Sequence, residues 1–284
     1  MEIIKDLPGM QQRAESIRLS GKKIGVVPTM GFLHEGHLSL IRQAKQRADV
    51  VITTIFVNPT QFGPGEDFEN YPRNFARDQK LAAEAGTDII FYPAKNEMYP
   101  SGFLTTVAVD KITQVMCGAS RPTHFQGVTT IVAKLLNLTK PHVAIFGQKD
   151  AQQVLVIQQM VKDLNMDVEI VIAPIIREED GLAMSSRNSY LTPAERKQAP
   201  VLFQSLQLAK SMIASGEKDA EKIAAQMTEK INEKDLAQID YITIVDTTWL
   251  QPVQKIKGEI LVALAVKFGK ARLIDNILIQ ESPI

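Results

Sequence analysis

The chain has 284 residues, of which 45% are hydrophobic and 23% are charged, and its formal net charge is zero. This composition is ordinary for a globular protein and argues against a disordered or fibrous one. Proteins that bind tRNA or DNA usually carry a surplus of basic residues, so the neutral balance disfavours nucleic acid as a partner.

The cysteine content and the N-terminus concern the cellular compartment. Cys117 is the single cysteine, so no intramolecular disulfide can form, as expected in a reducing compartment. The first residues carry charge and Pro8, where a signal peptide would need an unbroken apolar stretch. No apolar run approaches the roughly 18 residues of a membrane span. We therefore expect a cytoplasmic protein without membrane contact.

Short apolar runs alternate with segments of helical spacing in the first part of the chain. Val and Ile dominate these runs on both faces, as in buried parallel strands. The expected strands are Lys23–Val27, Val50–Val57, Asp88–Tyr92, Val143–Phe146 and Val168–Ala173. The helical spacing covers Leu38–Ala48, Val128–Leu138 and Val154–Leu164. This alternation predicts a doubly wound, Rossmann-like α/β sheet, in which ligands bind at the carboxyl ends of the strands.

The pattern changes after about residue 180. Two charged amphipathic helices are expected, followed by three strands, in a smaller α+β domain. The helices are Pro193–Gly216 and Asp219–Lys234, and the strands are Asp240–Val245, Glu259–Val266 and Arg272–Ile279. The expected division is residues 1–177 for the nucleotide- and substrate-binding domain and 178–284 for the smaller domain.

The segment PTMGFLHEGH (28–37) joins an expected strand to an expected helix. Its two histidines, His34 and His37, are three residues apart and can face one ligand from the first helical turn. A helix N-terminus favours anions, and imidazole donors there can stabilise charge on a phosphate. Two alternatives compete with this interpretation. The histidines could be capping or core residues, or they could bind zinc, which would need a third ligand from elsewhere.

A long loop follows the next expected strand and begins FVNPTQF (56–62). Loops of this length are uncommon unless they are functional. Asn58 and Gln61 can offer directional hydrogen bonds to a small polar substrate. Simple turn chemistry is the alternative explanation for the same pair.

The segment FGQKD (146–150) again leads from a strand through a glycine into a helix. Lys149 would lie near the helix start, where the helix dipole disfavours a cation and a bound polyphosphate would offset that cost. Asp150 is expected either to cap the helix or to contact a ribose.

The segment AMSSRN (183–188) lies at the expected domain junction. Ser185, Ser186 and Arg187 form a compact set of donors that suits phosphate oxygens. At a hinge, such a loop can move and grip a phosphate.

Together these four segments resemble the pantothenate synthetase (pantoate–β-alanine ligase) family of the nucleotidyltransferase superfamily, which also includes class I aminoacyl-tRNA synthetases. PTMGFLHEGH resembles the His-x-Gly-His signature of that superfamily. AMSSRN resembles the counterpart of its second phosphate-binding loop, and the order of the segments fits across nearly the whole chain.

The resemblance implies a ligase reaction in two steps. ATP and (R)-pantoate would give a pantoyl-adenylate and pyrophosphate, and the amine of β-alanine would then attack the mixed anhydride to give pantothenate and AMP. The family also implies a homodimer that uses Mg²⁺, although the sequence does not identify the protein ligands of the metal.

Site residues follow from the resemblance position by position. His34, His37 and Lys149 would be catalytic, with His37 as the proton donor. Gln61 and Gln153 would hold pantoate, and Asn58 would bind substrate and reach a phosphate. ATP would contact Met30, His34, His37, Gly147, Lys149, Asp150, Ile176, Met184, Ser185, Ser186 and Arg187.

Four further positions receive no firm catalytic or binding role. Arg121, His124 and Gln126 lie in RPTHFQGV, which resembles a family segment near the substrate site, and His142 is expected to be structural. Phe32 and Thr123 depart from the usual Ala and Gly of the family without replacing a group expected to do chemistry.

Other functions remain in competition. A nucleotidyltransferase that adenylates another small phosphorylated or carboxylate substrate would need only the histidines and phosphate loops. A nucleotide sensor would bind ATP without releasing pyrophosphate. A tRNA synthetase is disfavoured by the short, neutral chain.

Overall fold

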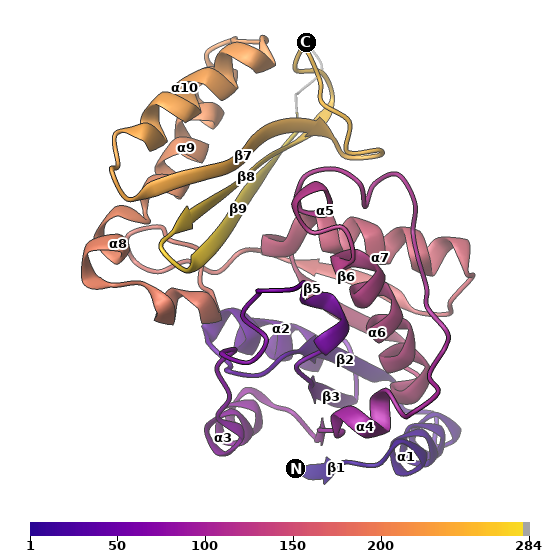
Figure 1. Cartoon of the computed structure of the whole chain (residues 1–284). Helices are drawn as coiled ribbons and strands as arrows, with labels where there is room; N and C mark the ends of the chain where they lie inside the picture. The colour runs from indigo at the N-terminus through magenta and orange to yellow at the C-terminus, as the bar shows by residue number, and fades with distance from the viewer. Residues whose placement is uncertain (281–284) are drawn as a thin grey trace.

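A six-stranded parallel sheet forms the larger part of the computed structural model, which describes residues 1–280 (Figure 1). The strand order is β1-β4-β3-β2-β5-β6. The strands are β1 (Glu2–Ile4), β2 (Ile24–Thr29), β3 (Val50–Ile55), β4 (Ile89–Phe91), β5 (Val143–Gly147) and β6 (Glu169–Ala173). The predicted doubly wound α/β fold is confirmed.

Helices cover both faces of this sheet, because its strands are apolar on both sides. One face packs against α1 (Leu7–Leu19), α6 (His124–Thr139) and α7 (Ala151–Asp163). The other packs against α2 (Glu35–Lys45) and α3 (Phe75–Ala85). Short turns and helices complete this part: η1 (Pro59–Gln61), α4 (Lys95–Met98), α5 (Cys117–Ser120) and η2 (Gln148–Asp150).

The strand order determines where a ligand site is expected. The chain moves outward from β2 through β3 to β4, then returns to place β5 on the other side of β2. Gly25 of β2 therefore lies opposite Val143 of β5. The turns that leave these two strands emerge side by side at the switch point, where α/β sheets bind ligands.

A three-stranded antiparallel sheet forms the C-terminal part, as predicted. Its strands are β7 (Ala237–Asp246), β8 (Glu259–Phe268) and β9 (Ala271–Gln280). One face packs on α9 (Val201–Ala214) and α10 (Ala220–Asn232). Residues of the other face, such as Leu261 and Ala263, pack with residues of α5 and α7. This second contact places the small sheet against the helices α5 and α7 of the larger part (Figure 1).

The structure differs from the sequence prediction in several elements. The expected helix Pro193–Gly216 is two helices, α8 (Pro193–Gln198) and α9, separated at Ala199 and Pro200. Proline has no N–H for an interior helical hydrogen bond, so a second helix starts after it. β1 and α1 were not predicted, because β1 is short and the charged start of the chain has weak periodicity. No helix within residues 1–280 is long and apolar enough to cross a bilayer.

Candidate active site

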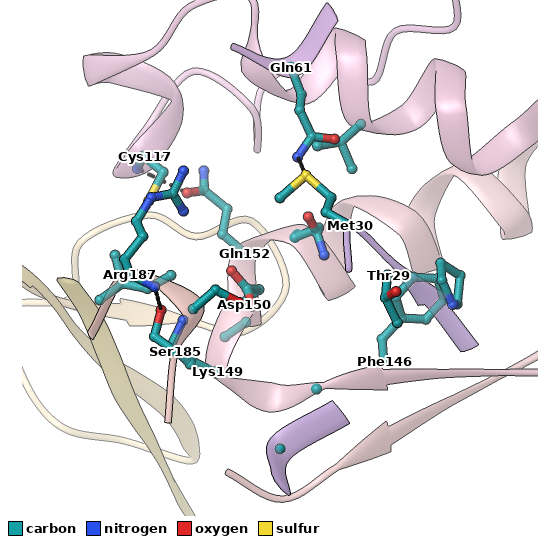
Figure 2. A pocket seen from close by; sticks show the side chains of 18 of the residues that line it. Thr29, Met30, Gln61, Cys117, Phe146, Lys149, Asp150, Gln152, Ser185 and Arg187 are labelled. Carbon is teal, nitrogen blue, oxygen red and sulfur yellow. Dashed lines mark hydrogen bonds between the residues drawn. The ribbon is translucent and has the colours of Figure 1, made fainter. Parts of the chain in front are cut away.

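One cavity of about 260 Å³ lies between the carboxyl end of the large sheet and the small sheet. Every residue predicted to contact ATP or substrate lines it. These residues are Met30, His34, His37, Asn58, Gln61, Gly147, Lys149, Asp150, Gln153, Ile176, Met184, Ser185, Ser186 and Arg187. Figure 2 shows Gln61 and Met30 on one side of the cavity, away from Lys149, Asp150 and Ser185. Segments far apart in the sequence thus meet at one place.

The turn after β2 is fixed by a buried carboxylate. Asp78 of α3 accepts hydrogen bonds of 2.7 Å from the N–H groups of both Phe32 and Leu33. Gly31 and Phe32 have φ angles of 83° and 50°, a region that disfavours residues with a Cβ. The paired N–H groups therefore offset the cost of a tight turn that delivers the histidines to the cavity.

His37 has a defined tautomer. The backbone N–H of His34 donates to His37 Nδ1 over 3.3 Å, so a neutral His37 carries its hydrogen on Nε2. The two rings lie 4.1 Å apart between centroids. His34 Nδ1 is buried and has no hydrogen-bond partner among residues 1–280. His37 therefore serves as part of the helix start and still offers an Nε2–H donor.

Their surroundings keep both rings neutral near pH 7. Burial lowers the pKa of His34 to about 2, helped by neighbouring His37 and Lys149. Burial also lowers the pKa of His37 to about 4, again with help from Lys149. At neutral pH the pair therefore consists of polar donors beside a cation, which suits a polyanion better than a further positive charge would.

The turn after β5 presents Lys149 and Asp150 without partners for their side chains. Asp150 occupies the N-cap position of α7, but its carboxylate makes no capping hydrogen bond. The capping role considered for Asp150 is therefore wrong. Neither side chain forms an ion pair or hydrogen bond within the part of the chain that the structure describes, so both are available to a ligand.

Gln61 is held with one donor free. Its Oε1 accepts from Asn58 Nδ2 over 3.0 Å, and its Nε2 donates to Met30 Sδ over 3.2 Å. An amide nitrogen carries two hydrogens, so one N–H remains for a substrate oxygen. Asn58 is only 1% exposed. Its Nδ2 also donates to Gly127 O, and its Oδ1 accepts from Tyr99.

Asn58 thus differs from its predicted role. Both of its amide hydrogens and its oxygen are used within the protein. The side chain borders the cavity and orients Gln61, and it has no free donor that could reach a phosphate.

Arg121 and His124 converge on the backbone of Gln61. Arg121 donates to Gln61 O over 3.1 Å, and His124 Nδ1 lies 2.9 Å from the same oxygen. Arg121 also forms a two-pronged ion pair with Glu66. Gly127 lets α6 approach this turn, because a Cβ there would lie 2.3 Å from Thr60 O. These contacts fix η1 against α6.

The two other positions without a firm role lie away from the cavity. Gln126 is exposed and donates to Thr106. It is not among the residues that line the cavity, whereas Arg121 and His124 of the same segment are. His142 accepts the Ile24 N–H at Nδ1 over 2.9 Å, which confirms the structural role expected for it.

The predicted phosphate loop closes the cavity from the other side. It forms η3 (Ser186–Tyr190), with Ser185 at the N-cap. Ser186 donates to Phe32 O over 3.3 Å, which ties the loop to the first turn. Arg187 forms a two-pronged ion pair with Asp67, at 2.9 and 2.8 Å. This predicted phosphate ligand is therefore paired with a carboxylate.

Several lining residues were missed. The face of α6 contributes an apolar wall, and the C-terminal sheet contributes Tyr241, Arg272, Asp275 and Asn276. A signal for the last two was present, because Asp and Asn are depleted in strands and here interrupt the apolar run of β9. Gln152 was passed over beside Gln153. It is buried and bonds the backbone at Ile112 and Val115.

Protein ligands for a metal are few. No group of three or more His, Cys, Asp or Glu side chains within residues 1–280 is arranged to hold an ion. The zinc alternative therefore lacks its third ligand in the described chain. The carboxylates on the cavity are Asp150 and Asp275, and Asp275 is bound to Arg177. Asp150 is the one that faces the cavity unpaired.

Known proteins of one family match this chain over nearly its full length. Residues 2–278 match the family model described as pantoate-beta-alanine ligase. The pantothenate synthetase of Caldicellulosiruptor bescii is 55% identical over 280 residues, covering 99% of each chain. That of Chloroherpeton thalassium is 56% identical over 283 residues, covering 99% of this chain and all of the other.

Solved structures agree as well. Pantothenate synthetase from Thermus thermophilus superposes with a TM-score of 0.93 at 42% identity, covering 98% and 99% of the two chains. Pantoate-beta-alanine ligase from Francisella tularensis, described as complexed with beta-gamma ATP and beta-alanine, gives a TM-score of 0.79 at 36% identity, covering 98% and 97%.

Proposed function

The chain belongs to the pantoate–β-alanine ligase family, and on that premise we propose how its residues carry out the reaction. It is an ATP-dependent ligase that joins pantoate to β-alanine and produces pantothenate. The observation that carries the residue assignments is the convergence of all the predicted contacts on one cavity. The alternative of a nucleotidyltransferase acting on another substrate is not favoured.

In the first step, a pantoate carboxylate oxygen attacks the α-phosphorus of ATP. The new P–O bond forms as the bond to pyrophosphate breaks. We assign Lys149, His34 and His37 to the phosphate oxygens, because a cation and neutral imidazole N–H donors there stabilise charge that moves onto pyrophosphate. Ser185, Ser186 and Arg187 are assigned to the same phosphates, with Asp67 released from Arg187 in exchange.

Nucleotide contacts complete the ATP site. Met30, Gly147, Ile176 and Met184 are assigned to the adenosine part. We assign Asp150 to the ribose, since its carboxylate makes no bond to α7 and can accept from hydroxyl groups.

Pantoate has two methyl groups, two hydroxyls and a carboxylate. Its polar groups suit the free N–H of Gln61 and the unpaired amide of Gln153, and its methyl groups suit the apolar wall of α6. We assign Asn58 to the orientation of Gln61. Such fixed contacts hold the carboxylate in line with the phosphorus, which lowers the entropic cost of the reaction.

In the second step, the unprotonated amine of β-alanine attacks the acyl carbon of the adenylate. The C–N bond forms, the C–O bond to AMP breaks and the amine loses its proton. The groups that close the cavity exclude water from the anhydride, which would otherwise be hydrolysed.

Four further points belong to the same proposal. Mg²⁺ would screen phosphate charge when bound, held mainly by ATP oxygens and water. A homodimer and a cytoplasmic location follow from the family and from the single cysteine. The boundary between the domains is proposed after Arg177, four residues beyond the end of β6 at Ala173.

The test is a complete product balance with Mg·ATP, with and without each substrate. At steady state we expect AMP, pyrophosphate and pantothenate to form in equal amounts. They should form only when pantoate and β-alanine are both present. ATP turnover that ignores pantoate would remove the assignments of Gln61 and Gln153.

A further inference from the structure

A side chain of the C-terminal sheet binds the backbone of the catalytic turn after β5. Asn276, in the middle of β9, donates through Nδ2 to the carbonyl oxygens of Gln148 and Lys149, each over 3.0 Å. Its Oδ1 accepts from Gln148 Nε2 over 3.3 Å. Asn276 is 3% exposed. Its amide is thus fully used on this turn.

Two adjacent carbonyls bound by one rigid amide fix the two peptide planes between them. Those planes set the directions in which Lys149 and Asp150 leave the backbone. Neither of these side chains has a partner of its own within residues 1–280, so their positions depend on the backbone that carries them. The amide of Asn276 supplies the hydrogen bonds from the small sheet that hold this backbone.

The strand that carries Asn276 is itself anchored. The adjacent Asp275, 2% exposed, forms a two-pronged ion pair with Arg177 at 2.6 and 3.0 Å. The guanidinium of Arg177 lies 4.0 Å from the ring centre of Phe203. A buried, two-pronged pair of this kind is geometrically specific. It holds β9 in register with the segment that joins the two sheets.

We propose that Asn276 is a positioning residue for adenylate formation and that it acts through Lys149. The inference rests on the proposed function, in which Lys149 binds the ATP phosphates. Docking of the small sheet is then a condition for the first chemical step, because the sheet holds the turn that carries the cation. Aminolysis of the adenylate, which releases AMP after pyrophosphate has formed, depends less on Asn276.

The test is a double-mutant cycle between Asn276→Asp and Lys149→Ala, measured by pantoate-dependent exchange of radiolabelled pyrophosphate into ATP. Aspartate keeps the size of the side chain but turns an oxygen toward two carbonyls. We expect Asn276→Asp to lower the exchange rate about tenfold to a hundredfold when Lys149 is present, from the loss of buried hydrogen bonds next to an unpaired charge. In the Lys149→Ala background we expect less than about a twofold further loss, since coupled residues are not additive.

Gln148→Ala is the matched control. It removes a side-chain bond to Asn276 and leaves the carbonyl contact intact, so exchange should stay within about twofold of wild type. Asn276→Ala serves if the aspartate variant does not fold, because it removes the donor without adding a charge.

Two outcomes would overturn the inference. If Asn276→Asp lowers the exchange rate equally with Lys149 present and in the Lys149→Ala background, its effect is a general structural one. If Asn276→Asp leaves the rate unchanged when Lys149 is present, Asn276 has no role in adenylate formation. A wild-type protein that shows no pantoate-dependent exchange would instead refute the proposed function, and the inference with it.

Discussion

The two turns that face the cavity look alike in sequence but are held in different ways. The turn after β2 is fixed from within its own part of the chain, by Asp78 of α3 on the N–H groups of Phe32 and Leu33. The turn after β5 is held from outside, by Asn276 of the small sheet. The first turn therefore does not depend on the small sheet for its shape. The second turn does, because Asn276 of that sheet binds its carbonyl groups.

Substitution of His37 should have the largest effect, because it removes a donor to the phosphates while Asp78 still holds the N–H groups of Phe32 and Leu33 in the first turn. We expect His37→Ala to lower adenylate formation by about 10²–10³, the usual cost of losing one donor to transition-state charge. The pyrophosphate exchange rate measures this loss, and the circular dichroism spectrum should match wild type. Activity within a few-fold of wild type would remove His37 from the phosphate site.

Substitution of Asp78 should show that the first turn is held locally. Asp78→Ala leaves two N–H groups of a tight turn without partners, and unpaired buried groups cost about 1–3 kcal/mol each. We expect the free energy of unfolding to fall by roughly 2 kcal/mol, as measured by urea denaturation. Asp78→Asn keeps one acceptor and should lose less. Equal stability of Asp78→Ala and wild type would contradict the local anchor.

A smaller effect concerns the pH dependence of stability, to which His37 of the first turn contributes. An unfolded histidine has a pKa near 6.5, while folded His37 has a pKa of about 4. Between these values the unfolded chain binds protons that the folded chain does not, so stability falls as the pH drops through this window. His37→Gln removes one such group. Between pH 7 and pH 5, the His37→Gln variant should therefore lose less stability than wild type, by about 1.8 kcal/mol.

The melting temperature at several pH values provides the measurement. Parallel curves for wild type and His37→Gln would mean that His37 is not neutral and buried as described.

Local patterns made the first turn predictable and hid the support of the second. The histidine pair, the glycines and the preceding strand lie within ten residues, so their joint meaning can be taken from sequence. The contact from Asn276 to Lys149 spans 127 positions, and no local pattern in either segment predicts it. The available signal was the pair Asp275 and Asn276 inside the otherwise apolar strand β9, because Asp and Asn are depleted in strands.

The role of Asn58 illustrates a second limit. Its place beside Gln61 was predicted, but the residues that use up its polar atoms, such as Tyr99 and Gly127, come from distant segments. Whether an amide faces a ligand or supports another amide depends on such partners. The break before α9 is different, because Pro200 was visible in the sequence and a continuous helix should not have been drawn through it.

The most direct test of the account is pyrophosphate exchange into ATP with pantoate and without β-alanine. The two turns are argued to assemble a pantoyl-adenylate before the amine is needed, so labelled pyrophosphate should enter ATP under these conditions and not when pantoate is omitted. Exchange that appears only after β-alanine is added would contradict a separate adenylation step, and with it the roles given to both turns.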